Sequence, residues 1–100
     1  MTAFNVVRMR VKPGGVDEFL KFHREEDVGA FSGMKSLRVV KTGDRDFCFI
    51  GEWTDMAALA AARPAMVATL DQFRDKLEDL GHGLGVTDPV SGELVVDRSA

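Results

Sequence analysis

The sequence predicts an α+β fold in which two helices cover one face of a four-stranded antiparallel sheet. Segments with alternating apolar residues, typical of strands, flank two segments whose apolar residues recur every three or four positions, as in helices. Turn residues separate these segments and give the order β-α-β-β-α-β. A chain of 100 residues has room for one core, so we expect a single domain over residues 1–100.

The first strand is predicted over residues 3–11, because its side chains alternate between two faces. One face carries Asn5, Val7, Met9 and Val11, and the other carries Phe4, Val6, Arg8 and Arg10. Pro13, Gly14 and Gly15 end this strand. A helix is predicted from Val16 to a point before Gly29, with two acidic residues in its first turn, where the helix dipole favours them.

Two further strands are predicted over residues 35–42 and 47–54, joined by a hairpin connection at residues 43–46. Asp55 is a predicted cap for a helix that begins at Met56. We expect this helix to be interrupted at Arg63-Pro64 and a second piece to run to Leu80, with Gly81 as its terminator. A last strand is predicted over residues 93–97. This order is that of the ferredoxin-like fold.

The other face of the sheet is left uncovered by such helices. We expect Val6, Cys48 and Ile50, or their neighbours of opposite parity, on this face, and a bare apolar patch usually marks an interface. The sequence therefore predicts a homodimer with two sheets packed face to face. Arg8 and Arg10 would form ion pairs there, near Glu52 or Cys48 if the first and third strands pair in parallel.

Composition excludes several classes of function. Thirteen Lys and Arg against sixteen Asp and Glu give a net charge of -3, which argues against a nucleic-acid partner. Two His and one Cys are too few for a Cys/His zinc site, so no metal is expected. The lone Cys48 allows no disulfide within the chain, and no membrane span or signal peptide is visible, so we expect a cytoplasmic protein without a membrane partner.

Three segments carry a resemblance to a known family. They are Asn5–Gly14, Gly29–Met34 and Phe49–Trp53, and in order and spacing they resemble the antibiotic biosynthesis monooxygenase-like family over residues 3–75. The resemblance implies a dimeric α+β barrel built from ferredoxin-like protomers, with a pocket between sheet and helices. It also implies either the oxygenation of polycyclic phenols without metal or flavin, or the degradation of haem.

Individual positions of this sequence can be compared with the residues that the haem-degrading branch of the family requires. Asn5 matches that branch's asparagine on the first strand, but the branch's proximal histidine should lie in residues 65–74, where there is none. The branch's tryptophan should lie near residues 60–62, where only alanines stand. Because haem iron needs an axial ligand, the sequence argues against haem, and no cofactor is expected.

Asn5 and His23 are the candidate catalytic residues. A carboxamide on the helix-facing side of the first strand can hold an oxyanion, although it can equally bond nearby backbone. His23 continues the apolar stripe of the first helix and has an ordinary pKa near neutrality, which suits a base that deprotonates a phenol. The alternative is a histidine at the edge of the core with its hydrogen bonds satisfied.

Four other residues are candidate substrate-binding residues, namely Trp53, Phe22, Phe73 and Arg63. Trp53 could stack on an aromatic substrate or anchor the junction of strand and helix. Arg63 could guard the mouth of the pocket or remain solvated. The acidic run at residues 25–27 is interpreted as a solvated helix end, and His82 as a residue of a solvated loop.

Two functions stay open at this point. The first is cofactor-independent oxygenation of a small aromatic or polyketide-like molecule, and the alternative is a non-enzymatic ligand-binding or regulatory dimer of the same fold. Residues 45–52 faintly resemble the aromatic octapeptide of RNA-recognition motifs. Its glycine position holds Asp46 and its last aromatic position holds Glu52, so RNA binding is disfavoured.

Overall fold

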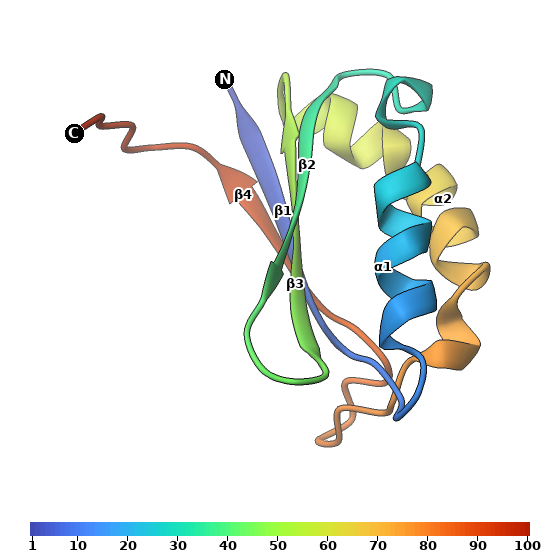
Figure 1. Ribbon diagram of the computed structural model, residues 1–100. Helices are drawn as coiled ribbons and strands as arrows, with labels where there is room; N and C mark the ends of the chain where they lie inside the picture. The colour runs from blue at the N-terminus through green and yellow to red at the C-terminus, as the bar shows by residue number, and fades with distance from the viewer.

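The computed structural model describes residues 1–100 and has the predicted order of elements. Its strands and helices are β1 (Ala3–Arg10), α1 (Val16–Glu25), η1 (Val28–Ala30), β2 (Met34–Lys41), β3 (Asp46–Trp53), α2 (Met56–Asp71), η2 (Arg74–Lys76) and β4 (Asp88–Glu93), of which η1 and η2 are short 3-10 helices. All neighbouring strands are antiparallel, in the order β2-β3-β1-β4. Both helices lie on one face of the sheet (Figure 1), so the predicted fold class is confirmed.

β1 runs through the centre of the sheet and carries residues that face the helices. Asn5, Met9 and Val11 are buried, as the alternation along this strand predicts. In the register of the sheet, Asn5 lies opposite Gly51 of β3 on one side and opposite Ser91 of β4 on the other. The register therefore places the polar side chains of Asn5 and Ser91 next to each other on a mostly apolar inner face.

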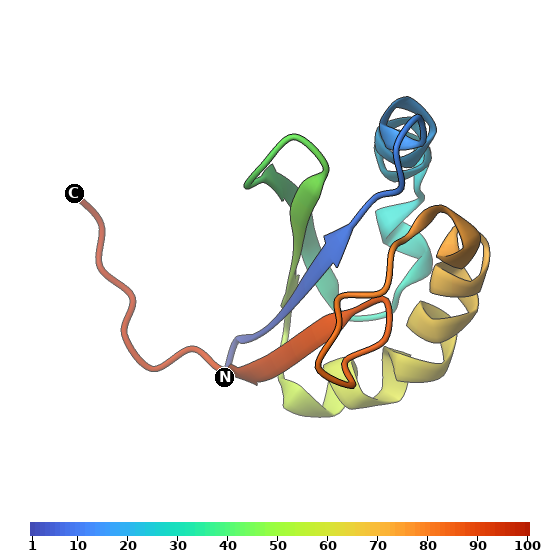
Figure 2. The ribbon, with the colours of Figure 1, turned by 90° about the horizontal axis from the view of Figure 1, so that it is seen from below.

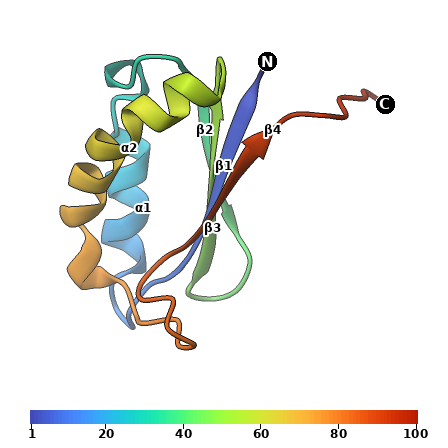
Figure 3. The ribbon, with the colours of Figure 1, turned by 180° about the vertical axis from the view of Figure 1, so that it is seen from behind.

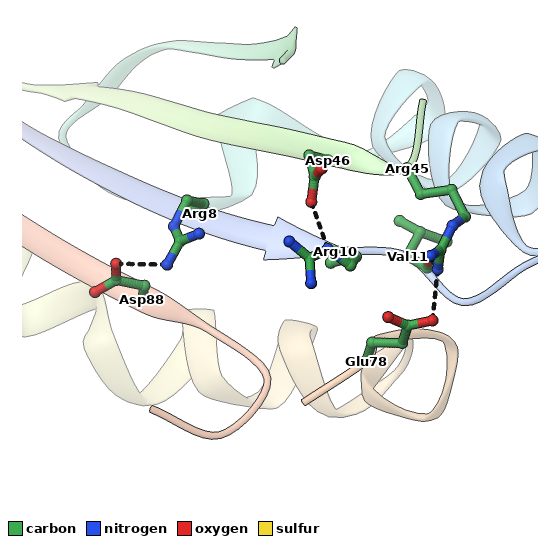
Figure 4. A network of polar contacts seen from close by, with 7 residues as sticks. All are labelled: Arg8, Arg10, Val11, Arg45, Asp46, Glu78 and Asp88. Atoms are coloured by element: carbon green, nitrogen blue, oxygen red, sulfur yellow. Dashed lines mark hydrogen bonds and ion pairs between the residues drawn. The ribbon is translucent and has the colours of Figure 1, made fainter. Parts of the chain in front are cut away.

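The parallel pairing considered for the first and third strands is wrong, because β1 and β3 are antiparallel. Arg8 lies opposite Cys48, and Arg10 lies opposite Asp46. Nε of Arg10 donates to Oδ1 of Asp46 at 2.7 Å, and Nη2 of Arg8 donates to Oδ2 of Asp88 at 3.3 Å (Figure 4). These ion pairs on the outer face form within one chain.

α1 brings two side chains to the sheet one helical turn apart. Phe19 is 1% exposed and His23 is 8% exposed. The helix ends where Glu26 adopts an extended backbone with φ -63° and ψ 132°. Asp27 then begins the next turn by accepting a hydrogen bond from the backbone N–H of Gly29 at 3.0 Å. The end of α1 lies before Gly29, as predicted.

α2 continues through Pro64, where the sequence predicts a break between two helices. A proline inside a helix removes one hydrogen bond and crowds the preceding turn, at a cost of about 3 kcal/mol. Leu59 and Ala62 before it are buried, and Met66 after it packs against the same core cluster, so burial on both sides offsets this cost. The helix bends instead of ending (Figure 3). No helix combines the length and apolar character needed to span a membrane.

The chain after α2 leaves the helical path earlier than predicted. α2 ends at Asp71 rather than Leu80, and Leu77 forms an isolated antiparallel bridge with Val11. Backbone hydrogen bonds of 2.8 Å on both sides of the bridge make this segment an extension of the sheet. Arg45 fastens it by donating to the carbonyl oxygen of Val11 and to the carboxylate of Glu78 (Figure 4).

β4 lies before the strand predicted over residues 93–97. Its pairing with β1 runs from Asp88 opposite Arg8 to Glu93 opposite Ala3, so β1 has no further strand residue to pair with beyond that point. Pro89 is tolerated because β4 is an edge strand, whose outward N–H positions need no partner. Leu94 still donates a backbone hydrogen bond to the carbonyl oxygen of Thr2 at 2.8 Å, and residues 95–100 then extend away from the sheet (Figure 2), with Val95 84% exposed.

Two apolar clusters fill the space between the sheet and the helices. The larger consists of Met9, Val11, Phe19, Phe47, Phe73 and Leu77. The smaller consists of Ala3, Trp53, Leu59 and Ala62. Members of both clusters line a cavity between the sheet and the helices.

Candidate functional site

A cavity of about 360 Å³ lies between the inner face of the sheet and the two helices. Ten of its eighteen lining residues are hydrophobic, and β1, β3, β4, α1 and α2 all contribute to its wall. Its polar lining residues are Asn5, His23, Glu26, Arg63, Thr69, Thr87 and Ser91. A mostly apolar cavity with a few polar groups is typical of sites for small organic molecules.

The carboxamide of Asn5 is fixed by two partners of different strength. Nε1 of Trp53 donates to its Oδ1 at 2.7 Å, and its own Nδ2 lies 3.9 Å from Sδ of Met66. Thioether sulfur is a weak acceptor, so Nδ2 keeps most of its capacity to donate. Because Met66 and Asn5 both line the cavity, this N–H group is positioned for an oxygen atom of a bound molecule.

Gly51 makes the approach of these two side chains feasible. It lies directly opposite Asn5 on β3. A Cβ atom at position 51 would clash with Oδ1 of Asn5 and would lie 3.0 Å from Nε1 of Trp53. A glycine inside a strand often marks such a close approach.

His23 lines the cavity, and one of its two ring nitrogens is unprotonated. Nδ1 lies 3.0 Å from the carbonyl oxygen of Phe19, which can only accept, so Nδ1 carries the proton in the neutral ring. Nε2 then holds the lone pair, has no partner in the protein and is not fully buried. Burial lowers the pKa of His23 from its ordinary 6.5, with a smaller opposing effect of the bond to Phe19. The ring is therefore neutral at pH 7 and can accept a proton.

Aromatic rings surround His23 and fix its position. Its ring centroid lies 4.5 Å from that of Phe19, 4.9 Å from that of Phe73 and 5.4 Å from that of Phe22. The Phe49 ring lies at 6.0 Å. These contacts leave the imidazole little freedom to turn away from the cavity.

Glu26 lines the same cavity three residues beyond His23. Its Oε2 atom is buried and has no hydrogen-bond partner, and desolvation raises the pKa of this carboxyl from its ordinary 4.5. The interpretation of residues 25–27 as a solvated helix end is therefore wrong for Glu26. The extended backbone at this residue, which ends α1, accompanies its placement at the cavity wall rather than in solvent.

Arg63 connects the two sides of the cavity. Its Nη2 donates to Oγ of Ser91 at 3.2 Å, which joins α2 to β4. Both residues line the cavity. The guanidinium group thus forms part of the wall, where a ligand can reach it.

The structure brings four of the six predicted site residues to the cavity, namely Asn5, His23, Phe73 and Arg63. Trp53 and Phe22 are not among the lining residues. Trp53 is 0% exposed and bonds Asn5, while the Phe22 ring lies 4.9 Å from that of Phe73, which does line the cavity. Glu26 and Gly51 were not predicted. No group of three or more His, Cys, Asp or Glu residues is arranged to hold a metal ion.

Sequence comparison finds no match to a protein-family profile and none to a curated protein. Solved structures do match. A protein of unknown function from Nitrosomonas europaea is 19% identical with a TM-score of 0.75, over 99% of this chain and 94% of that chain. An antibiotic biosynthesis monooxygenase is 19% identical with a TM-score of 0.70, over 94% and 99% of the two chains. The chain has the fold of these proteins.

A third solved structure that matches this chain contains a bound ligand. A variant of MhuD with two manganese protoporphyrin IX molecules bound per active site is 16% identical with a TM-score of 0.67, over 98% of this chain and 99% of that chain. The resemblance drawn from the sequence is therefore confirmed at the level of the fold. At these identities the similarity establishes the fold, and the chemistry depends on the residues that line this cavity.

Proposed function

We propose that the protein is a cofactor-independent oxygenase that binds a small aromatic or polyketide-like molecule in this cavity. The observation that carries the proposal is the placement of two complementary groups on one mostly apolar cavity. Nε2 of His23 is a free proton acceptor, and Nδ2 of Asn5 is a donor with only a weak partner. A phenol or its tautomer needs both groups in order to lose a proton and to have the resulting oxyanion stabilised.

The reaction follows from these roles. His23 takes a proton from the substrate, and Asn5 donates a hydrogen bond to the oxygen that becomes negative. The electron-rich ring carbon then forms a bond to dioxygen, which is reduced to the level of a hydroperoxide and takes up the proton. Loss of water leaves a carbonyl group. For an anthrone, one dioxygen is consumed, and one anthraquinone and one water are formed.

We also propose that two chains pair through their outer sheet faces. Val6 lies opposite Ile50 and Val90, and Val40 lies opposite Cys48, so these apolar side chains share one face. Val40 is 44% exposed and Val90 is 64% exposed. Exposed apolar area of this kind is stabilised by association, and a second copy offers a face of the same chemistry.

Oxygen uptake with a panel of anthrones and hydroquinones tests the oxygenase activity. His23→Phe keeps an aromatic ring among the phenylalanines that surround position 23 and removes the base. The rate of oxygen uptake should therefore fall by about 10² to 10⁴. Asn5→Ala should lower it by about 10² to 10³. His82→Asn is the matched control, because His82 is the other histidine and has a left-handed backbone with φ 54° that asparagine tolerates.

Two outcomes would contradict this proposal. If His23→Phe and Asn5→Ala consume oxygen as fast as the unchanged protein, the assigned roles are wrong. If the unchanged protein binds the aromatic compounds and consumes no oxygen, the non-enzymatic ligand-binding function replaces the oxygenase.

A further inference from the structure

The proposed oxygenation leaves one buried polar group of the cavity without a role. Oε2 of Glu26 is buried and receives no hydrogen bond. Buried polar atoms in proteins are almost always paired, and a carboxylate oxygen without a donor is especially costly. Glu26 also belongs to the cavity wall, and its other carboxylate oxygen, Oε1, has no hydrogen-bond partner and is not fully buried, so a molecule bound in the cavity can donate to it.

No neighbouring charged group satisfies this carboxyl. The other titratable residues on the wall are His23 of α1 and Arg63 of α2, while β1, β3 and β4 contribute none. His23 donates to the backbone of Phe19, and Arg63 donates to Ser91, so neither bonds Glu26. Burial accordingly raises the pKa of Glu26, with no cationic partner to oppose it.

The spacing along the chain places Glu26 near the proposed base. His23 lies in the last turn of α1, Glu26 is the residue that directly follows the helix, and both line the cavity. One aromatic ring system can therefore reach both side chains through two different substituents.

We propose that Glu26 accepts a hydrogen bond from a second hydroxyl group of the bound aromatic molecule. The protein then selects aromatic compounds with a hydroxyl group in addition to the one that faces His23 and Asn5. This inference rests on the proposed function for the identity of the first hydroxyl group. The contact with Glu26 itself requires only that the cavity binds such a molecule.

Calorimetric titration under argon tests the selectivity without turnover, with 1-naphthol and 1,3-dihydroxynaphthalene as probes. Glu26→Leu removes the acceptor and should weaken binding of the dihydroxy compound at least about tenfold, as expected for a hydrogen bond to a charged group. Binding of 1-naphthol should change less than about twofold, since it lacks the second donor. Glu25→Leu is the matched control, because Glu25 is the exposed neighbour and should leave both affinities unchanged.

A measurement on the unchanged protein keeps the inference testable if Glu26→Leu does not fold. In a carbon-13 NMR titration of the Glu26 carboxyl, 1,3-dihydroxynaphthalene should lower its pKa and 1-naphthol should not, because a donor stabilises the ionised form. Equal effects of the two probes, or failure of the dihydroxy compound to bind, would overturn the inference. Selective binding without oxygen uptake would instead overturn the oxygenase and leave the role of Glu26 intact.

Discussion

Trp53 donates a hydrogen bond from its indole Nε1 to Oδ1 of Asn5 at 2.7 Å, and this bond sets the orientation of the Asn5 carboxamide. The indole N–H can only donate, so the oxygen of the amide must face it and the NH₂ group must face the other way. The donor end of Asn5 is thereby directed toward Met66 at the cavity wall. Trp53 acts on the cavity through Asn5, since it is fully buried and does not line the cavity itself.

Replacing Trp53 by Phe should destabilise the fold and loosen Asn5. The substitution removes the donor, leaves Oδ1 of Asn5 without a partner and opens space in the core, at a combined cost of about 2–3 kcal/mol. Urea unfolding followed by circular dichroism measures this cost. Binding of an aromatic probe should weaken as well.

A double-mutant cycle separates positioning from general loss of stability. If Trp53 acts through Asn5, the effect of Trp53→Phe on ligand affinity should largely disappear when Asn5 is already alanine. Additive effects of the two substitutions would show that Trp53 contributes independently of Asn5.

Gly51→Ala should disturb the same pair from the opposite strand. The new Cβ atom would clash with Oδ1 of Asn5, so either the hydrogen bond or the strand must shift, at a cost of about 1–3 kcal/mol. Gly92→Ala is the control, because Gly92 lies in β4 opposite β1 and a Cβ atom there meets nothing within 4 Å. Thermal unfolding of the two variants should differ clearly, and equal melting temperatures would contradict the packing argument.

The regions where sequence and structure agree are those where one periodicity decides the conformation. The alternation along β1 gave its inner face correctly, because a strand has only two faces. The region after Asp71 differed because Phe73 and Leu77 satisfy a helical spacing and yet are buried in a non-helical segment, where pairing with Val11 decides between the two. The local sequence pattern does not specify this tertiary pairing between Leu77 and Val11. Pro64 is a similar case, since burial on both sides overrides its local effect.

The site could be predicted where a residue type and a face of an element coincide. Asn5 and His23 were found in this way, as a polar and a titratable residue on apolar faces. Glu26 was not predicted because it lies in a run of acidic residues. The sequence does not indicate that the backbone turns at that residue. Gly51 was missed because its role depends on the register between β1 and β3, which no single segment specifies.

The stability of the protein should depend on the protonation of His23. Burial lowers its pKa below the ordinary 6.5, so between the two values the native state binds fewer protons than the unfolded state. The free energy of unfolding therefore rises with pH in this window, and the contribution is lost as pH falls through the native pKa. Urea unfolding at pH 5 and pH 7.5 measures the free energy of unfolding at each pH. His23→Phe should reduce the difference between these two free energies, whereas His82→Asn should preserve it.

Association through the outer sheet face should be sensitive to a single charge. Val6→Lys places an ammonium group among the apolar residues of that face, next to Ile50 and Val90, and burying an unpaired charge is strongly unfavourable. Light scattering at micromolar concentration should give a dimer for the unchanged protein and a monomer for this variant. Ala61→Lys adds the same charge to an exposed position of α2 and should remain dimeric. A monomer for the unchanged protein would contradict the proposed pairing.

Glu26→Gln should stabilise the folded protein at neutral pH in the absence of ligand. Desolvation raises the pKa of Glu26 above its ordinary 4.5, so between the two values the native state binds more protons than the unfolded state, and stability falls as pH rises through this window. A neutral amide removes that loss, so the variant should gain stability relative to the unchanged protein between pH 4 and pH 7. Urea unfolding at both pH values measures the gain, with Glu25→Gln as the exposed control. If the difference in unfolding free energy between Glu26→Gln and the unchanged protein is the same at both pH values, the carboxyl of Glu26 is solvated in solution, and its burial against the cavity is refuted.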